Sequence, residues 1–244
     1  MPVLADEEVG RVLVVVAHPD DAEFWLGGTI ARWTDAGVDV ALCVLTDGGA
    51  GGFDPAVPRS AVPGIRRAEQ ERAAGLLGIG AVCFVGLGEG EVRAGNLDLH
   101  RRLVRLIRRV RPDRVVTWSP EWNWQRFRSC HPDHLATGTL TLHAVYPDAG
   151  NPFAVLGDAE GEALEAWTVR EAWLINSPVR EVNHYVDVTD VFDLKVAAVR
   201  AHESQTGDRA DLAHELRERI AANTAAAGLP PGRLAEAFQV VTTG

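Results

Sequence analysis

The sequence predicts an α/β fold, with a mostly parallel sheet, helices on both of its faces and a C-terminal extension. The first observation is the run Val12-Leu13-Val14-Val15-Val16, because a continuous apolar and mainly β-branched run is typical of a strand buried on both faces. The second is the alternation of such runs with helix-like segments, which indicates right-handed crossovers between parallel strands. Together they describe a Rossmann-like arrangement.

The first half of the chain predicts four strands separated by three helices. The expected order is strand 11–17, helix 24–36, strand 38–45, helix 65–77, strand 81–85, helix 97–110 and strand 114–118. Gly37 and Gly78 follow the first two helices as typical stops, and Pro112 follows the third. The third helix is amphipathic, with aliphatic residues on one face and arginines on the other. The glycine-bearing loop 46–63 is longer than most connections, which favours a functional role.

The second half of the chain predicts fewer regular elements. Residues 119–130 form an aromatic, polar loop, and Pro132 suits the first turn of a helix that reaches about residue 145. The remaining expectations are loop 146–165, strands 168–175 and 185–188, and helices 191–201 and 210–227. The last fifteen residues or so fit no single pattern. Because no linker divides the chain, we expect one domain over residues 1–244, with a core at about 11–145 and an extension at about 146–244.

Composition limits the expected partners and location. The chain has 244 residues, a net charge of −10 and a pI of about 5.3, so it lacks the basic face that nucleic acid needs. No apolar run approaches the ~20 residues of a membrane helix, and the N-terminus shows no signal peptide pattern. Cys43, Cys83 and Cys130 fit reduced thiols better than a disulfide framework. We therefore expect a cytoplasmic protein without a membrane span. Exposed strand edges could pair between subunits, so a homo-oligomer stays an open alternative.

Polar clusters follow two of the predicted strands. His18-Pro19-Asp20-Asp21 comes after the first strand, and His131-Pro132-Asp133-His134 comes after the fourth strand and its loop. Ligands of open α/β sheets bind beyond the carboxyl ends of strands, and a buried charged cluster is costly unless it is paired, solvated or bound to a metal. A histidine and an aspartate from the first cluster, with a histidine from the second, supply the three protein ligands of a catalytic zinc site. The same set suits Fe²⁺.

The other members of the two clusters could supply the chemistry. Neighbouring side chains diverge, so one of Asp20 and Asp21 can bind the metal while the other meets the water that the metal acidifies. His131 and His134 share one face of a first helical turn, so one can reach the metal while the other points into the reaction space. Asp133 is placed to accept a hydrogen bond from an imidazole N–H.

These motifs resemble the LmbE/PIG-L family of zinc-dependent N-acetylglucosaminyl deacetylases, especially its bacterial, actinobacterial-like members. The resemblance rests on AHPDD at 17–21, TDGG at 46–49, the Arg-x-x-Glu that begins at Arg66, and HPDH at 131–134. Further matches are VDVTD at 186–190 and AHESQ at 201–205, so the similarity covers roughly residues 11–205.

The resemblance implies a role for most of these residues. The implied zinc ligands are His18, Asp21 and His134. Asp20 is implied to activate a zinc-bound water, His131 to stabilise the tetrahedral oxyanion or protonate the amine, and Asp133 to orient His131. Arg66 is implied to bind the substrate. Asp47 ends the second strand, where it either lines the cleft or closes a Thr-Asp-Gly-Gly turn.

The implied function is metal-dependent hydrolysis that removes an acetyl group from a small N-acetylglucosamine-type amino sugar. Two alternatives stay open: an amidase for a longer N-acyl sugar or a mycothiol-type conjugate, and a non-catalytic metal- or sugar-binding protein. A nucleotide-binding oxidoreductase is disfavoured, because the loop after the first strand lacks G-x-G-x-x-G and its two aspartates would repel a pyrophosphate. Ser129 stands where some mycothiol-pathway members carry tyrosine, which argues against that pathway's substrate.

Several residues outside the motifs carry weaker expectations. Trp122, Trp124 and Phe127 either stack on a sugar or pack within their loop. Cys130 adjoins His131 but is expected to be a bystander, because three better metal ligands are present. His202 is expected to be structural or to line the cleft.

Overall fold

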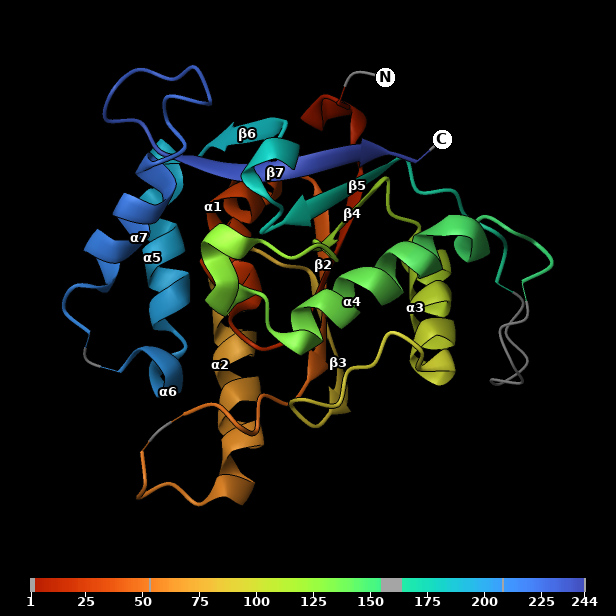
Figure 1. The fold of residues 1–244 in the computed structure, drawn as a ribbon, viewed down its shortest axis with the longest axis horizontal. Helices are drawn as coiled ribbons and strands as arrows, with labels where there is room; N and C mark the ends of the chain where they lie inside the picture. The colour runs from red at the N-terminus through yellow and green to blue at the C-terminus, as the bar shows by residue number, and fades with distance from the viewer. Residues whose placement is uncertain (1–2, 53, 155–163, 208, 244) are drawn as a thin grey trace.

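The computed structural model describes residues 3–52, 54–154, 164–207 and 209–243, and within them seven strands form one sheet (Figure 1). The strands are β1 (Arg11–Val16), β2 (Asp39–Thr46), β3 (Ala81–Leu87), β4 (Arg114–Trp118), β5 (Glu171–Ile175), β6 (His184–Asp187) and β7 (Ala235–Thr242). Their order across the sheet is β3-β2-β1-β4-β5-β7-β6. The first five strands pair in parallel, and β7 runs antiparallel to both β5 and β6. The predicted α/β fold with a mostly parallel sheet is confirmed.

Helices cover both faces of the sheet. They are α1 (Asp21–Asp35), α2 (Val62–Leu76), α3 (Leu97–Val110), α4 (Pro132–His143), α5 (Phe192–Arg200), α6 (Glu203–Thr206) and α7 (Leu212–Ala221). In Figure 1, α3 and α4 lie to the right of the sheet and α1 and α2 to its left, with α5 and α7 on the outer side of α1. A 3₁₀ segment, η3 (Trp124–Ser129), lies between β4 and α4.

The residues of β1 divide between two hydrophobic cores. Val12, Val14 and Val16 point to the face covered by α1, where they join a cluster that includes Leu26 and Trp33. Leu13 and Val15 point to the opposite face, together with leucines of α3. Since successive side chains of a strand alternate between faces, a strand buried on both sides must be apolar at every position. This explains the uninterrupted run in the sequence.

The order of the strands brings the two polar clusters together. Strand β1, the middle one of the five parallel strands, has β2 on one side and β4 on the other, so the chain changes direction across the sheet at β1. Ligands of open α/β sheets bind at such a switch point, beyond the carboxyl ends of the strands. The segment after β1 and the segment after β4 leave the sheet side by side at this position.

Several predicted boundaries differ from the structure. Helix α1 begins at Asp21 rather than at residue 24, because the Asp20 carbonyl already accepts the first helical hydrogen bond, from Phe24 N at 3.0 Å. Helix α7 ends at Ala221 rather than at residue 227. The unassigned C-terminus forms strand β7, whose Glu236 is buried and so breaks the apolar pattern of a strand.

The predicted loop 146–165 is only partly a loop. Helix α4 continues into a π-helical segment, η4 (Ala144–Ala149), and residues 155–163 lie outside the described part of the chain. Across the described ranges, no helix is both long and apolar enough to cross a membrane.

Candidate metal centre

The chain turns sharply where β1 ends. Asp20 has a φ of 96°, in the left-handed region that aspartate tolerates better than most residues. The next residue, Asp21, starts α1 and turns its carboxylate back toward the strand, where Oδ2 accepts hydrogen bonds from Ala17 N at 3.1 Å and His18 N at 2.8 Å. The turn therefore sends the adjacent carboxylates in different directions, as the sequence predicted for neighbouring side chains.

Three side chains converge beyond the ends of β1 and β4. His18 Nδ1 lies 3.0 Å from His134 Nε2, which is 3.3 Å from Asp21 Oδ1. His18 Nδ1 is also 3.6 Å from Asp21 Oδ2. Two imidazole nitrogens and a carboxylate within 4.8 Å of one another can together hold one metal ion.

In both His18 and His134, the ring nitrogen that faces away from the three converging ligand atoms is close to an oxygen atom, and this contact orients the ring. His18 Nε2 lies 3.2 Å from Asp133 Oδ2, and His134 Nδ1 lies 2.9 Å from the Ser129 carbonyl oxygen. When these nitrogens carry the protons, the lone pairs of His18 Nδ1 and His134 Nε2 face each other across 3.0 Å. Two lone pairs at this distance repel unless a cation lies between them, so the donor set fits a metal ion.

The electrostatics of the site favour positive charge at the same point. Burial disfavours a charged His18 ring, but hydrogen bonds to Asp133 and Asp21 outweigh burial and raise the pKa of His18 to about 10. Burial also opposes ionisation of Asp21, yet His134 and His18 lower the pKa of Asp21 well below its usual value. A bound cation would take over the charge that a proton otherwise supplies.

Asp133 contacts His18 more closely than His131. Its Oδ2 accepts from Gly90 N at 2.6 Å in addition to His18 Nε2, and its Oδ1 accepts from Val92 N at 3.2 Å. The Asp133 carboxylate is farther from His131, with Oδ2 at 3.8 Å from His131 Nδ1. The carboxylate is therefore fixed by backbone amides and in turn fixes the ring of a candidate metal ligand.

His131 lies next to the candidate metal ligands, on their solvent-exposed side. Its side chain is 37% exposed, and its ring meets the His18 ring edge-on at 4.9 Å. Nδ1 accepts a hydrogen bond from Asp133 N at 3.1 Å, which leaves the proton of a neutral ring on Nε2. Burial and the neighbouring His18 and His134 lower the pKa of His131. The geometry thus presents one N–H donor beside the three converging ligand atoms.

Asp20 is held from α2. Arg66 Nη2 lies 3.0 Å from Asp20 Oδ2, and Gln70 Oε1 accepts from Asp20 N at 3.0 Å. Burial raises the pKa of Asp20 to about 6, against the opposing effect of Arg66. Asp20 therefore has the environment of a carboxylate that can exchange a proton near neutral pH.

Arg66 is buried beneath the loop that follows β2. Its guanidinium donates to the carbonyl oxygens of Pro19, at 2.5 Å, and Gly48, at 3.0 Å. A Cβ on Gly48 would lie 2.5 Å from Arg66 Nη1, so only glycine leaves room for this contact. Arg66 also contacts Asp20 and lies 3.8 Å from Glu89 Oε2, and its predicted contact with substrate stays a prediction.

Asp47 closes a turn. Its Oδ1 accepts a hydrogen bond from Gly49 N at 2.8 Å, the geometry of an Asx turn. It also lines a cavity of about 200 Å³, together with Pro19 and Phe84. The structure therefore shows the predicted turn, while the cavity contains none of the candidate metal ligands and the contact of Asp47 with substrate stays a prediction.

Trp118 belongs to the site and was not predicted from the sequence. Its ring stacks on the His134 ring at 3.6 Å with an interplanar angle of 8°, and its Nε1 donates to Asp21 Oδ2 at 3.2 Å. It is the last residue of β4, the strand next to β1. Its position at the carboxyl end of that strand, just before the predicted loop 119–130, was the available signal.

The weaker candidates lie around the site. Cys130 Sγ accepts a hydrogen bond from Asn123 N at 3.2 Å and is not one of the converging candidate ligands His18, Asp21 and His134. Trp122, Trp124 and Phe127 stack on one another and are exposed. His202 is buried, with Nε2 at 3.3 Å from Glu23 Oε2.

The chain is similar to known proteins over most of its length. The family model described as "PIG-L: GlcNAc-PI de-N-acetylase" matches residues 13–145. Diacetylchitobiose deacetylase of Thermococcus kodakarensis is 33% identical over 81% of this chain and 71% of its own length. A probable N-acetyl-alpha-D-glucosaminyl L-malate deacetylase of Bacillus cereus is 33% identical over 80% of this chain and 84% of its length.

Further relatives include an actinobacterial enzyme and a solved structure. The 1D-myo-inositol 2-acetamido-2-deoxy-alpha-D-glucopyranoside deacetylase of Rhodococcus jostii is 31% identical over 80% of this chain and 81% of its length. The structure of N,N'-diacetylchitobiose deacetylase from Pyrococcus horikoshii, in complex with an inhibitor, superimposes with a TM-score of 0.85 at 28% identity, covering 96% of this chain and 85% of that one.

Proposed function

Because the chain belongs to the PIG-L family and is a deacetylase, we propose that it removes the acetyl group from the amide of a small N-acetylglucosamine-type molecule with the help of a bound zinc ion. The observation that carries this proposal is the convergence of His18, Asp21 and His134 beside Asp20, a second carboxylate that is not needed to complete a three-ligand set. The named relatives act on different N-acetylglucosamine compounds, and this supports the substrate class without selecting one compound.

The proposed metal ligands are His18 through Nδ1, His134 through Nε2 and Asp21 through its carboxylate. Two nitrogens and one oxygen suit Zn²⁺ at a catalytic site, and they suit Fe²⁺ as well. When bound, the metal supplies Lewis acidity toward the amide carbonyl and lowers the pKa of a nearby water.

Asp20 is proposed as the general base. Its carboxylate receives the proton of the attacking water and passes it on when the amide bond breaks. Arg66 limits the freedom of this carboxylate through the contact at 3.0 Å, and Gln70 holds the backbone behind it. Orientation of this kind lowers the entropic part of the barrier.

His131 is proposed to stabilise the charge that develops on the substrate. Its Nε2–H can donate to the carbonyl oxygen as the oxygen becomes negative, or to the amine as it leaves. One preorganised donor of this type commonly accounts for ~2.7–4 kcal/mol of transition-state stabilisation. Asp133 acts indirectly, because it orients the His18 ring and supplies the backbone N–H to His131 Nδ1.

The test is acetate release by the zinc-loaded protein from a panel of N-acetylglucosaminyl compounds, with a chelator and with zinc restored. We expect release that the chelator abolishes and zinc recovers. Longer N-acyl analogues in the panel distinguish a deacetylase from the alternative amidase. Stoichiometric zinc without release of any acyl group would contradict the proposed activity.

A pair of histidine variants tests the ligand set separately. His134→Ala is expected to lose zinc, because it removes one of three protein ligands. His214→Ala, which changes an exposed histidine on α7, is expected to keep it. Unchanged zinc stoichiometry in His134→Ala would remove this residue from the ligand set.

A further inference from the structure

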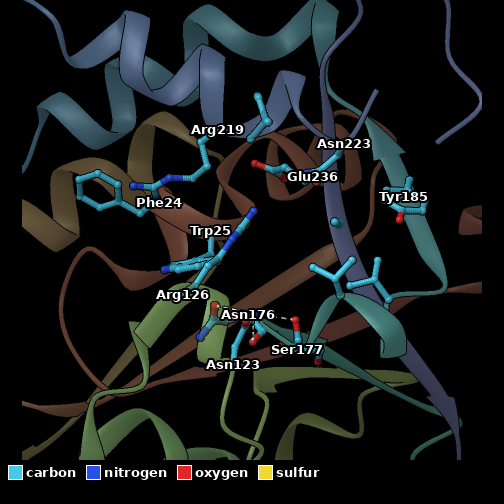
Figure 2. A pocket seen from close by; sticks show the side chains of 14 residues that line it. Phe24, Trp25, Asn123, Arg126, Asn176, Ser177, Tyr185, Arg219, Asn223 and Glu236 are labelled. Atoms are coloured by element: carbon cyan, nitrogen blue, oxygen red, sulfur yellow. Dashed lines mark hydrogen bonds between the residues drawn. The ribbon is translucent and has the colours of Figure 1, made fainter. Parts of the chain in front are cut away.

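A second cavity, of about 60 Å³, is lined in part by Trp25 (Figure 2). Trp25 in turn contacts Trp118, which stacks on His134 of the candidate metal centre. It is bounded by α1, η3, α7, the segment after β5 and the β6–β7 pair, and its lining includes Trp25, Asn123, Arg126, Ser177 and Arg219. None of the candidate metal ligands lines it. Nothing in the proposed deacetylation uses these residues, so the cavity needs its own explanation.

Two arginines reach the cavity without an acidic partner. The guanidinium carbons of Arg126 and Arg219 lie 5.7 and 5.6 Å from the centre of the Trp25 ring. Neither guanidinium has a hydrogen-bond acceptor or an ion-pair partner in the described part of the chain. Burial lowers the pKa of both side chains, and the charge of Arg126 lowers the pKa of Arg219 further. Arg126 is half-buried and Arg219 is exposed, so two neighbouring cations face one cavity that is open to solvent.

The acid in the cavity lining does not neutralise them. Glu236 Oε1 lies 2.6 Å from Lys195 Nζ, and its Oε2 accepts from Thr29 Oγ1 at 2.6 Å. Glu215 of α7 forms its ion pair with Arg209, and its charge opposes the effect of burial on the pKa of Arg219. The lining therefore keeps a net positive charge, which an anion would relieve.

Two buried polar atoms of the same wall also lack partners. Asn123 is 2% exposed and Ser177 is 5% exposed, and within the described residues neither Asn123 Oδ1 nor Ser177 Oγ has a hydrogen-bond partner. Asn123 Nδ2 donates to the Ser177 carbonyl oxygen at 2.9 Å, which fixes the amide and leaves its oxygen unused. Figure 2 shows both residues on the wall opposite Arg219. Buried polar atoms are normally hydrogen-bonded, so these two atoms are exceptions on one wall of the cavity, and a small rotation of either side chain would bring it to a ligand there.

We propose that this cavity binds a single oxyanion group, a carboxylate or a phosphate, belonging to a small molecule that also offers a hydroxyl. Guanidinium groups match the oxygens of carboxylates and phosphates, and the Ser177 hydroxyl can donate to them. Asn123 Oδ1 accepts from a hydroxyl, either on a protonated phosphate or next to a carboxylate. A cavity of about 60 Å³ has room for one such group.

The site is close to the candidate metal centre but separate from it. Trp25 meets Trp118 edge-on at 5.2 Å, and Trp118 stacks on His134. Two aromatic rings therefore stand between the cavity and the metal ligands. Binding of the anion does not depend on the proposed deacetylation, and the two can fail independently.

Calorimetric titration of the zinc-loaded protein tests this proposal. The probes are inorganic phosphate and lactate, with chloride at matched ionic strength as the reference, so that phosphate and carboxylate are distinguished. Arg126→Gln and Arg219→Gln are expected to weaken the Kd about tenfold or more, because each removes a charge-assisted contact. Ser177→Ala, which removes a neutral donor, is expected to weaken it less.

Matched controls come from the same two elements. Arg128 on η3 and Arg217 on α7 carry the same charge but do not line the cavity, so their glutamine variants are expected to keep the wild-type Kd. Arg126→Lys keeps the positive charge but lacks the planar guanidinium that can donate two parallel hydrogen bonds, so it should give an intermediate Kd. Equal Kd values for Arg126→Gln and Arg128→Gln, or no heat from either anion, would overturn the proposal.

Discussion

At the scale of single residues, Asp21 shows how the candidate metal centre is built. Its Oδ2 accepts from two backbone amides at the end of β1 and from the Trp118 indole, while its Oδ1 faces His134. The carboxylate is thus fixed before any ligand arrives. Preorganised ligands of this kind bind metal more tightly than ligands that must first be ordered.

Trp118→Phe is expected to weaken zinc binding about tenfold or more, because loss of an outer hydrogen bond to a metal ligand has effects of this size. Phenylalanine keeps a smaller aromatic ring against His134 and removes the N–H that Asp21 accepts. The measurement is a competition titration with a chromophoric chelator. Trp33→Phe is the control, since its buried indole donates to the distant Asp6. Equal affinities of wild type and Trp118→Phe would show that the indole does not support the site.

The sequence could predict the residues of the two motifs but not their partners. His18, Asp21 and His134 lie in short motifs, and their meeting follows from the parallel pairing of β1 and β4. The contacts of Trp118 depend on how α4 lies across the sheet, and those of Arg66 on the path of the loop after β2. Neither path follows from hydrophobic periodicity, because both are set by contacts distant in sequence.

At the scale of elements, the position of α4 depends on Gly138. A Cβ on this residue would collide with the Trp118 carbonyl oxygen, so glycine permits the helix to lie directly against the end of β4. This close contact places His134, one turn earlier on the same helix, over the Trp118 ring.

Gly138→Ala is expected to destabilise the protein by about 1–3 kcal/mol, the usual cost of overpacking. It should also weaken zinc binding, because the displaced helix carries His134. Gly75→Ala on α2 is the control, since a Cβ there meets nothing within 4 Å and alanine stabilises a helix interior by about 0.5–1 kcal/mol. Urea unfolding and zinc titration of both variants measure the difference, and equal stabilities would contradict the packing argument.

The turn between β6 and the following helix is held by Asp187. Its Oδ1 accepts from Thr189 N at 3.0 Å and Thr189 Oγ1 at 2.6 Å, and its Oδ2 lies 2.6 Å from Arg233 Nη2. Burial opposes ionisation, but the bonds from Thr189 and Arg233 outweigh it and lower the pKa of Asp187 below 3.8. The ionised carboxylate therefore connects β6 to the start of β7.

Asp187→Asn is expected to reduce the free energy of unfolding by about 1–3 kcal/mol at neutral pH. A carboxyl group whose pKa is lower in the folded state stabilises the fold above the pKa of the unfolded chain, and this contribution disappears as the pH falls through the folded pKa. The difference between wild type and variant should therefore shrink from pH 7 to pH 3, as urea unfolding at both pH values would report. A difference that grows on acidification would contradict this assignment.

The hydrophobic periodicity of the sequence predicted most of the helices and strands, but it predicted their first and last residues less accurately. The first four strands and the helix Leu97–Val110 follow directly from apolar runs and an amphipathic pattern. Strand β7 could not be recognised, because its buried Glu236 resembles a surface residue until its partner Lys195 is known. That partner lies on α5, and no local pattern connects the two.

At the scale of the whole molecule, Lys195 joins three distant segments. It is the only lysine in the sequence and is fully buried. Its Nζ donates to the carbonyl oxygens of Glu23 and Phe24 in α1, each at 2.9 Å, and pairs with Glu236 of β7 at 2.6 Å. The C-terminal part of the chain is thereby fixed to the helix that carries Asp21.

Lys195→Met is expected to destabilise the protein by about 3–5 kcal/mol, because it leaves the buried Glu236 carboxylate without its counter-charge. Adding Glu236→Met should recover part of this loss, since the unpaired charge then disappears. Urea unfolding of the single and double variants measures the coupling. Additive losses would show that the two side chains do not act as a pair.

The central claim is that Asp20 acts as the base beside a metal held by His18, Asp21 and His134. The most direct measurement compares kcat for acetate release, at equal bound zinc, between wild type and Asp20→Asn, with Asp35→Asn at the far end of α1 as the control. Asp20→Asn is expected to retain zinc but to lose activity by about 100-fold or more, while the control is unchanged. Full activity in zinc-loaded Asp20→Asn would contradict it.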